Sequence, residues 1–240
     1  VYWTNAFGGA PSVNRSNVNG TPTTTVLTSS ASDSANIKSP DALAVDGTNL
    51  YWGDYIKAHI FRMVKDGSAK AEIMNAAESL APTDIVVDAS HVYFAYLDGW
   101  AVLPIGATTA TPQTFQLQLV SSAVIGLDGT SLFFRSPGAV SGTAVFSRIP
   151  AGSVSPSQAV TAAAVNPSDN AFAVDATYLY YWSDALYRVA KTGGTPQKLS
   201  PNVDNVVKIL VHSENGGRAI YWLNQGNASG STGTVRKLAL

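Results

Sequence analysis

The 240-residue sequence predicts an all-β protein built from small repeated antiparallel sheets, and three observations support this. Pairs of aromatic residues recur at intervals of 40 to 49 residues along the chain. Four of these pairs follow a short turn sequence that starts with Asp-Gly or Asp-Ala, and Asp-Gly is a strong hairpin signal. No segment sustains the apolar period of 3.6 residues that marks an amphipathic helix.

The spacing of the aromatic pairs refines this class to a β-propeller. The pairs begin at Tyr2, Tyr51, Tyr93, Phe133, Tyr181 and Tyr221. A period of 40 to 50 residues with short strands is typical of four-stranded propeller blades. We therefore expect one domain over residues 1–240, a six-bladed β-propeller of four-stranded antiparallel blades. The expected repeats are about 1–38, 39–80, 81–120, 121–166, 167–203 and 204–240.

Each repeat reads as strands a, b, c and d in order. In the second repeat, strand a is LAVD at 43–46, and its small and β-branched residues suit a crowded inner position. Strand b carries Tyr51 and Trp52, which point to opposite faces of the sheet. Strand c is IFRMV at 60–64, and Arg62 precedes a turn glycine, Gly67. Both faces of a blade are covered by its neighbours, so Trp52 and its counterpart Trp182 should be core residues.

The two ends of the chain differ from the other repeats. The first repeat begins at strand b, and the last stops at 234–240, which reads as strand c. We expect the first and last blades to be incomplete. A fragment or processed form of a longer protein would explain this better than an imperfectly closed ring.

Two known repeat families resemble this pattern. VYWTN at the start and LYWGD from Leu50, followed by IFRMVKDG from Ile60, resemble the YWTD repeat of low-density-lipoprotein-receptor-type propellers. The run from Pro40 to Asp46 also resembles the NHL repeat. Both families form six-bladed propellers, and the YWTD resemblance implies a bond between blades from its fourth residue. That position matches at Asp54 and Asp184, nearly matches at Asn5 and Asn224, and departs at Tyr96 and Ser136.

Composition excludes several classes of partner. Charged residues make up 13% of the chain and the net charge is −1, so no basic field is present for nucleic acid or anionic lipid. Cysteine is absent, which excludes disulfides and thiolate metal sites. No run of about 20 mostly apolar residues occurs, so we expect no membrane insertion. The sequence makes no prediction about oligomeric state.

The loops indicate which face binds a ligand. The a–b turns are short, whereas the b–c loops are uneven and long at 5–12, 135–142 and 224–233. Uneven loops on one face of a repeat protein often mark its binding face. We expect ligand binding by the b–c/d–a face at the channel mouth, through Tyr55, His59, Tyr96, Asp98, Trp100, Arg135, Asn224 and Gln225. These aromatic, amide and charged groups suit a protein or a glycan. Trp100 could instead pack at the start of its strand c.

The sequence favours a non-catalytic, secreted or cell-envelope binding protein with no metal or other cofactor. The recurring Asp46, Asp88, Asp128 and Asp175 are expected to cap turns through their side chains. A first alternative is a calcium-assisted hydrolase or lactonase-like enzyme, with ligands from Asp41, Asp84, Asn170 or Asn205. A second is a structural repeat domain of a larger surface protein. The recurring Arg15, Arg62, Arg148 and Arg188, with Arg236 as a further candidate, should pair locally on strand c.

Overall fold

The structure is a computed structural model, and it divides the chain into two compact units, Val1–Ile125 and Gly126–Leu240. Each unit is described by itself. The residues that the structure describes are 2–6, 11–16, 23–28, 37–75, 80–97, 99–107, 112–116, 124–137, 144–153, 158–160, 171–201, 203, 205–214, 217–224 and 233–240.

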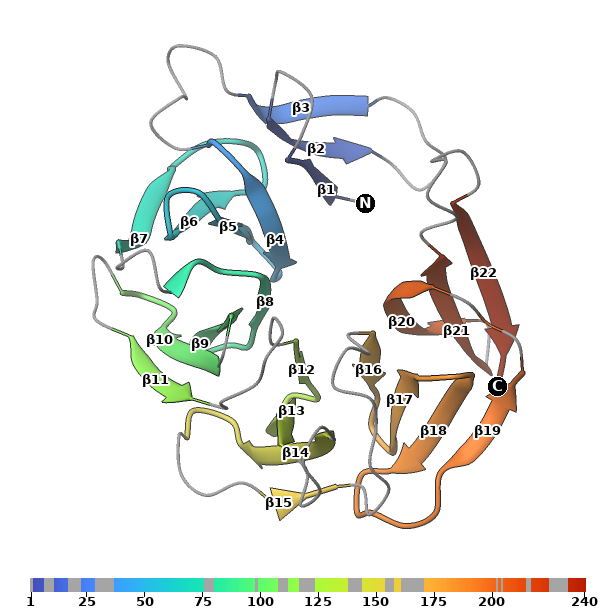
Figure 1. Cartoon of the computed structure of the whole chain (residues 1–240). Coiled ribbons are helices and arrows are strands. Elements are labelled where there is room, and N and C mark those ends of the chain that lie inside the picture. The colour runs from blue at the N-terminus through green and yellow to red at the C-terminus, as the bar shows by residue number, and fades with distance from the viewer. Residues whose placement is uncertain are drawn as a thin grey trace. The chain divides into compact units, whose positions relative to one another are not determined.

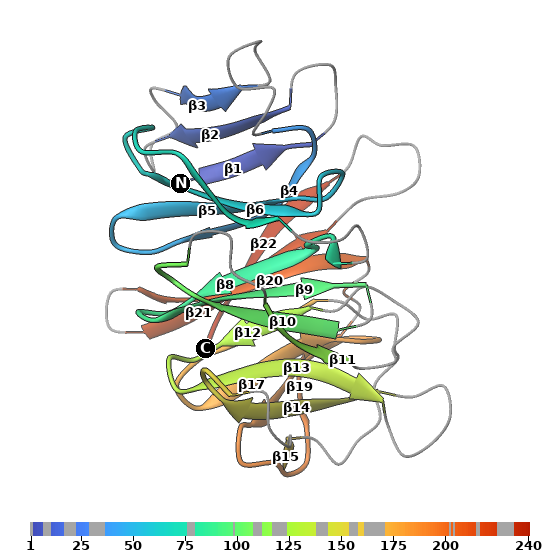
Figure 2. The same cartoon turned by 90° about the vertical axis from the view of Figure 1, so that its left-hand side faces the viewer.

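The first unit holds three antiparallel sheets, each in chain order (Figure 1). The first sheet consists of β1 (Tyr2–Asn5), β2 (Ser12–Ser16) and β3 (Thr23–Thr28). The second consists of β4 (Pro40–Val45), β5 (Asn49–Asp54), β6 (His59–Val64) and β7 (Ala71–Asn75). The third consists of β8 (Asp84–Val87), β9 (His91–Tyr96), β10 (Gly99–Pro104) and β11 (Gln113–Gln116). In a second view, β9 lies between β8 and β10 (Figure 2).

The second unit also holds three antiparallel sheets in chain order. The first consists of β12 (Ile125–Leu127), β13 (Ser131–Pro137), β14 (Ala144–Pro150) and β15 (Gln158–Ala159). The next consists of β16 (Phe172–Val174), β17 (Tyr178–Trp182), β18 (Leu186–Ala190) and β19 (Gln197–Ser200). The last consists of β20 (Val206–Glu214), β21 (Gly217–Asn224) and β22 (Thr234–Ala239).

Each sheet falls inside one of the repeats expected from the sequence. Four sheets have strands a, b, c and d, and the all-β prediction is confirmed. The expectation about the ends is also met among the described residues. The first sheet begins with β1, which carries the strand-b aromatic pair and has no strand a. In the described part of the chain, the last sheet ends with β22, a strand c that pairs with β21.

Successive aromatic residues on strand b enter different cores, because neighbouring side chains of a strand point to opposite faces. Tyr51 belongs to a cluster shared with the third sheet, including Ile85 and Phe94. Trp52 belongs to a cluster on the other face, with Val13 of the first sheet, and stacks on Phe61 at a ring-centroid distance of 5.3 Å. Both aromatic side chains are fully buried. The prediction that both blade faces are covered is therefore confirmed for this sheet.

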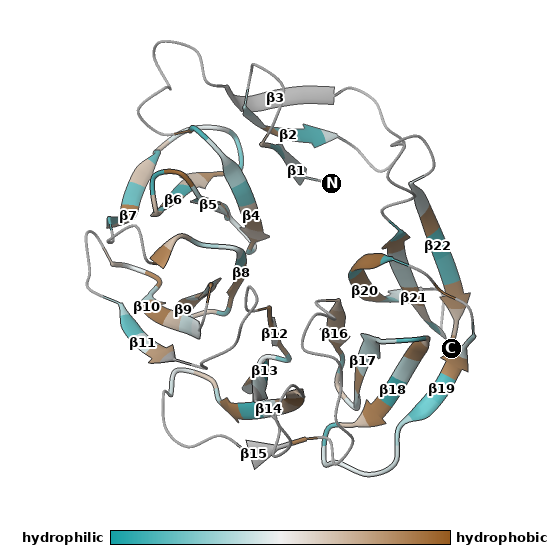
Figure 3. Cartoon of the chain, viewed as in Figure 1, coloured by the Kyte–Doolittle hydropathy of each residue, from teal (hydrophilic) through white to brown (hydrophobic). Residues whose placement is uncertain are grey.

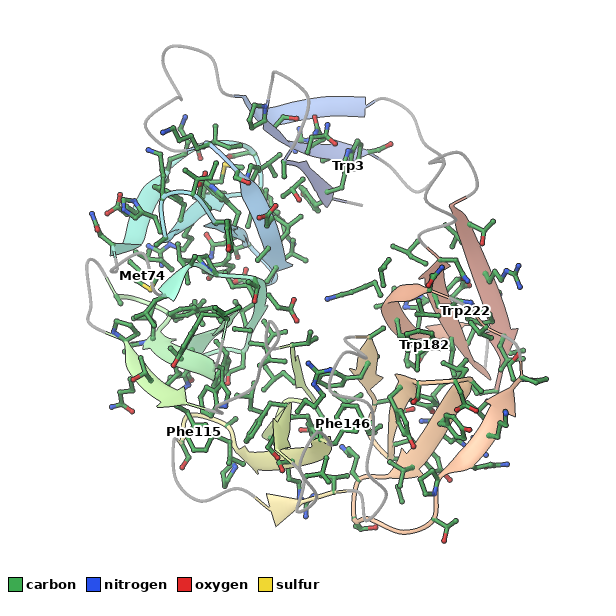
Figure 4. All side chains as sticks on the ribbon, viewed as in Figure 1. Trp3, Met74, Phe115, Phe146, Trp182 and Trp222 are labelled. Carbon is green, nitrogen blue, oxygen red and sulfur yellow. The ribbon has the colours of Figure 1, made fainter. Side chains whose placement is uncertain are left out.

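Trp182 is a partial exception to the predicted core. It is only half-buried, and its indole N–H donates to the carbonyl oxygen of Val203. Trp182 packs at the margin of a cluster that includes Trp222 of the last sheet, and the two lie close together in Figure 4. The reason is the register: Arg188 lies opposite Tyr180 as Arg62 lies opposite Tyr51. The counterpart of Trp52 is therefore the buried Tyr181, and Trp182 lies one residue further along the strand.

The recurring aspartates cap the a–b turns, as predicted. Asp46 Oδ1 accepts the backbone N–H groups of Thr48 and Asn49, both at 2.6 Å, and Oδ2 accepts the Tyr51 hydroxyl at 2.7 Å. The same pattern occurs at Asp88, with Ser90, His91 and Tyr93, and at Asp175, with Thr177, Tyr178 and Tyr180. The carboxylate thus ties the turn to the tyrosine five residues later.

Asp128 shows how this pattern tolerates a change. The residue five positions later is Phe133, which has no hydroxyl group. Lys191 of the neighbouring sheet takes that place, because its ammonium group donates to Asp128 Oδ2 and lies 5.6 Å from the centre of the Phe133 ring. Both members of this ion pair are largely buried.

The strand-c arginines do more than pair locally. Arg188 donates to Gln197 within its own sheet, but Arg15 and Arg62 donate to backbone carbonyls of the next sheet, Lys65 and Ile105, at 3.0 and 2.9 Å. The further candidate, Arg236, lies on strand c of the last sheet, but not at the position equivalent to Arg62. Lys237 lies opposite Tyr221, as Arg62 lies opposite Tyr51, whereas Arg236 lies opposite Trp222.

Candidate binding surface

The b–c turn of the second sheet is held in place by hydrogen bonds to the side chain of Asp54. This side chain is fully buried, and its Oδ2 accepts the backbone N–H groups of Lys38 and Ser39, the latter at 2.9 Å. Its Oδ1 accepts the N–H of Lys57 at 3.1 Å, inside the turn itself. A further bond runs from the Tyr55 N–H to the Ser39 carbonyl oxygen at 2.9 Å. Asp54 therefore fastens the b–c turn to the segment that leads into strand a.

This anchored turn carries two exposed apolar side chains. Tyr55 is 49% exposed and Ile56 is 58% exposed. Ala58 closes the turn with φ of +55°, a left-handed conformation that non-glycine residues rarely adopt. The turn thus exposes an aromatic and a branched aliphatic side chain, and its backbone is held by the hydrogen bonds to Asp54 and Ser39.

The b–c turn of the third sheet lies between buried aromatic residues instead of on a buried carboxylate. Tyr96 and Trp100 flank it and are buried, with Trp100 stacked on Phe115 at 5.3 Å. Gly99 lies so close to Phe115 that a Cβ there would be 2.2 Å from its carbonyl oxygen, which excludes any side chain. Leu97, at the tip, is 61% exposed. Among the described residues of this turn, the buried aromatic side chains support an exposed leucine.

The two turns belong to neighbouring sheets of one unit. Gly53, next to the first turn, lies against Pro82, which precedes strand a of the third sheet; a Cβ on Gly53 would be 2.5 Å from the proline ring. In a meander of antiparallel strands, b–c turns and d–a connections lie at the same end. Tyr55, Ile56 and Leu97 therefore occupy one end of the paired sheets, and we call these three residues the loop patch.

The structure redistributes the residues that the sequence placed on this face. Tyr55 is exposed as expected. Tyr96 is buried and donates its hydroxyl to the Phe115 carbonyl oxygen, and Trp100 packs at the start of strand c, its alternative placement. Arg135 of the second unit is also buried. These three side chains are therefore buried and not exposed as expected. For Tyr96 and Trp100 the reason is contact with Phe115 of the neighbouring strand β11.

His59 and Asn224 are intermediate in burial between the exposed Tyr55 and the buried Tyr96, Trp100 and Arg135. His59 begins β6, is half-buried, and has Nδ1 at 3.1 Å from Glu72 Oε2. Asn224 is half-buried at the end of β21, opposite Thr234. Asp98 and Gln225 lie outside the described residues, as do most of the long b–c loops at 5–12, 135–142 and 224–233.

Ile56 and Leu97 were missed by the sequence reasoning. That reasoning looked for aromatic and polar groups in long loops, whereas these aliphatic residues sit in short turns. The signal in the sequence was an aliphatic residue inside a b–c turn, Ile56 before Lys57 and Leu97 before Asp98. Only the exposure of the side chain in the structure distinguishes such a residue from a core residue that lies near a turn.

The residues expected to hold calcium have different structural environments. Asp84 accepts the N–H of Ile125 at 3.3 Å, Asn205 has φ of +49°, and Asn170 lies outside the described residues. Burial, followed by the negative charge of Asp54, raises the pKa of Asp41. In the described part of the chain, no group of three or more His, Asp or Glu side chains is arranged to hold a metal ion. The same residues include no helix long and apolar enough to cross a membrane.

The Asp positions that match the YWTD pattern behave differently from each other. Asp54 is buried and joins two connections, as described above. Asp184 is exposed and accepts the Tyr187 hydroxyl at 2.8 Å, with Lys198 at 3.7 Å. Its contacts are confined to its own sheet.

Comparison with known proteins supports the fold. The sequence matches no protein-family profile and no curated protein. Among solved structures, a chain of the nidogen/laminin complex is similar, with a TM-score of 0.60 and 17% identity over 79% of this chain and 70% of that one. A gluconolactonase from Xanthomonas campestris is similar with a TM-score of 0.59 and 13% identity over 88% of this chain and 75% of that one. The chain therefore has a β-propeller fold of small antiparallel sheets.

Proposed function

We propose that this chain is a six-bladed propeller of the YWTD/NHL-like type that acts as a non-catalytic, secreted or cell-envelope binding module. Its ligand is a protein, which it recognises through the b–c/d–a end of the blades. The observation that carries this proposal is the loop patch, Tyr55, Ile56 and Leu97, which is exposed on two turns. The first turn is held by hydrogen bonds to the buried Asp54, and the second is flanked by the buried Tyr96 and Trp100.

The apolar and aromatic side chains of the loop patch, carried on ordered turns, favour a protein ligand over a glycan. Interface cores are enriched in aromatic and aliphatic groups, and a turn that is already ordered loses little entropy on binding. A sugar site would instead need convergent hydrogen-bonding groups beside the ring. The nidogen/laminin structure, one of the similar folds, was solved as a complex between proteins, which agrees with this proposal.

The test compares variants of the loop patch with a matched control. Ile56→Asp and Leu97→Asp place a charge at the centre of the proposed interface, so each should weaken a partner's Kd by at least tenfold, or about 1.4 kcal/mol. Val45→Asp is the control, because Val45 is also an exposed aliphatic residue of the second sheet but lies at the a–b end. Partners are captured from the secreted and envelope fractions by crosslinking, and each Kd is then measured with the purified partner.

Two results would contradict the proposal. One is a partner that binds Ile56→Asp, Leu97→Asp and Val45→Asp with equal affinity. The other is specific binding on a glycan array, or turnover of a lactone that is lost on adding a calcium chelator, with no protein partner found. The chelator arm also tests the calcium-dependent alternative.

A further inference from the structure

Two turn aspartates of the second unit also link neighbouring sheets. Asp128 caps the turn after β12, and its Oδ2 accepts the ammonium group of Lys191, which follows β18 of the next sheet. Asp175 caps the turn after β16, and its Oδ2 accepts a guanidinium N–H of Arg218 in β21 at 2.5 Å. The strands that lead into these turns, β12 and β16, are hydrophobic (Figure 3). We call the two ion pairs the linking pairs.

The polar links between the three sheets of the first unit are of a different kind. Arg15 and Arg62 donate to backbone carbonyl oxygens of the following sheet, and these groups do not titrate in acid. Asp46 and Asp88 cap the equivalent turns, but in the described part of the first unit neither forms an ion pair with another sheet. The basic group beside Asp88 is His91 of the same turn, with Nδ1 at 3.6 Å from Oδ1. The units therefore share the turn cap and differ in the link.

The groups that face the two carboxylates determine what a proton does there. They are Lys191 at Asp128, and Tyr180 and Arg218 at Asp175, with Arg188 acting on Tyr180. Burial acts to raise the pKa of both carboxyls, but Lys191 at Asp128 and the turn N–H groups at Asp175 lower it by more. The carboxylate form is therefore the one that the folded second unit holds.

Loss of that charge would leave each cation without its partner. The side chain of Lys191 is only 13% exposed, and that of Asp128 is 4% exposed. A largely buried cation whose partner is removed is strongly destabilising, because it has neither a counter-charge nor water. Separation of the two sheets would return the ammonium group to water.

We propose that the linking pairs make the second unit acid-sensitive: protonation of Asp128 and Asp175 separates its three sheets, while the sheets of the first unit stay joined. Each carboxylate takes up one proton, and Lys191 and Arg218 keep theirs and become hydrated. Stabilisation by the linking pairs is complete above about pH 4 and is lost as the pH falls through the lowered pKa values of the two aspartates. This device is separate from the loop patch, whose residues all belong to the first unit.

Hydrogen exchange of the full chain, read by mass spectrometry, tests both units in one experiment. Protection of backbone amides, taken relative to the unstructured rate at each pH, reports local opening. It is followed from about pH 6 to about pH 2 in strand b of each sheet, β13, β17 and β21 against β5 and β9. We expect protection in the second unit to fall by a further factor of about ten or more than in the first.

Arg218→Met separates the link from the turn cap, because Asp175 keeps the N–H groups of its turn. At about pH 6 this variant should already lose about tenfold in the protection of β17 and β21. Acid should then lower their protection no more than it lowers that of β9. Lys198→Met is the matched control, since Lys198 pairs with Asp184 inside one sheet at 3.7 Å and both side chains are exposed. It should leave the protection of every strand unchanged.

Three results would overturn the proposal. One is an equal loss of protection in both units as the pH falls, and another is full protection of β17 and β21 down to about pH 2. The third is an Arg218→Met variant with the protection and the acid sensitivity of the wild type. Asp175→Asn covers the case in which Arg218→Met does not fold. It cannot titrate, so at about pH 6 it should show the low protection that the wild type reaches only in acid, and wild-type protection at both ends of the range would contradict the proposal.

Discussion

At the scale of single residues, the strand-b aromatics show how closely side chain and architecture are coupled. Tyr51 and Trp52 are neighbours in sequence but enter clusters on opposite faces of one sheet. A sheet with one solvated face would leave one of them exposed. Their complete burial therefore depends on neighbouring sheets covering both faces.

Truncating Trp52 tests this burial. Trp52→Ala removes an indole that stacks on Phe61 and leaves a cavity beside Val13, so the free energy of unfolding should fall by about 3–5 kcal/mol. Denaturant titration of the two proteins measures the change. Tyr55→Ala, at an exposed position, should cost less than about 0.5 kcal/mol. A loss of less than about 1 kcal/mol for Trp52→Ala would contradict the assigned packing.

At the scale of elements, the a–b turn is a unit that tolerates substitution when the donor is replaced. Three turns use a tyrosine hydroxyl to complete the aspartate's bonds, and the fourth uses Lys191 from a neighbouring sheet. The chemical requirement is a donor to Oδ2 and not a particular residue. This also explains why a hairpin motif that repeats well in sequence contains one phenylalanine in the tyrosine position.

A double substitution tests this exchange of donors. Lys191→Met leaves the carboxylate of Asp128 largely buried without its ammonium partner, and breaking such a pair costs about 3–5 kcal/mol. Adding Phe133→Tyr restores a hydroxyl donor as in the other three turns, and the double variant should recover at least about 1 kcal/mol. Chemical denaturation of the wild type, both single variants and the double variant gives the coupling energy. Strictly additive effects would contradict the shared role.

At the scale of the whole molecule, the capped turns link stability to pH. Partial burial alone would raise the pKa of Asp46, but the N–H groups of Asn49 and Thr48 and the Tyr51 hydroxyl lower it to about 2. The pKa values of Asp88, Asp128 and Asp175 are also lowered, by the same kinds of donor acting against burial. Four repeats thus carry a turn aspartate whose pKa is lowered in the folded state.

The sign of the pH dependence follows from these shifts. An unfolded aspartate has a pKa of about 3.9, so the folded state holds its turn carboxylates in the charged form more tightly. Their stabilisation is complete above about pH 4 and is lost as the pH falls through their lowered pKa values, which for Asp46 is about 2. Melting temperature should therefore decline over this range. An Asp46→Asn/Asp88→Asn variant, whose amides do not titrate, should decline less steeply, and an unchanged slope would contradict this account.

The sequence alone determined the repeat, the strands within it and the identity of the turn caps. It could do so because aromatic pairing on alternate faces and aspartate capping are local, and both recur at a fixed period. Sequence could not tell Leu97 from Tyr96, since neighbouring residues at a strand end differ only in what covers them.

Only the tertiary structure decided which side chains reach the surface. Burial of Tyr96, Trp100 and Arg135 arises from packing by other strands and turns, which no local pattern encodes. The inter-sheet bonds of Arg15 and Arg62 depend in the same way on the neighbouring sheet. Repetition in sequence therefore specifies the blade, whereas contacts between distant segments select the residues that remain available for binding.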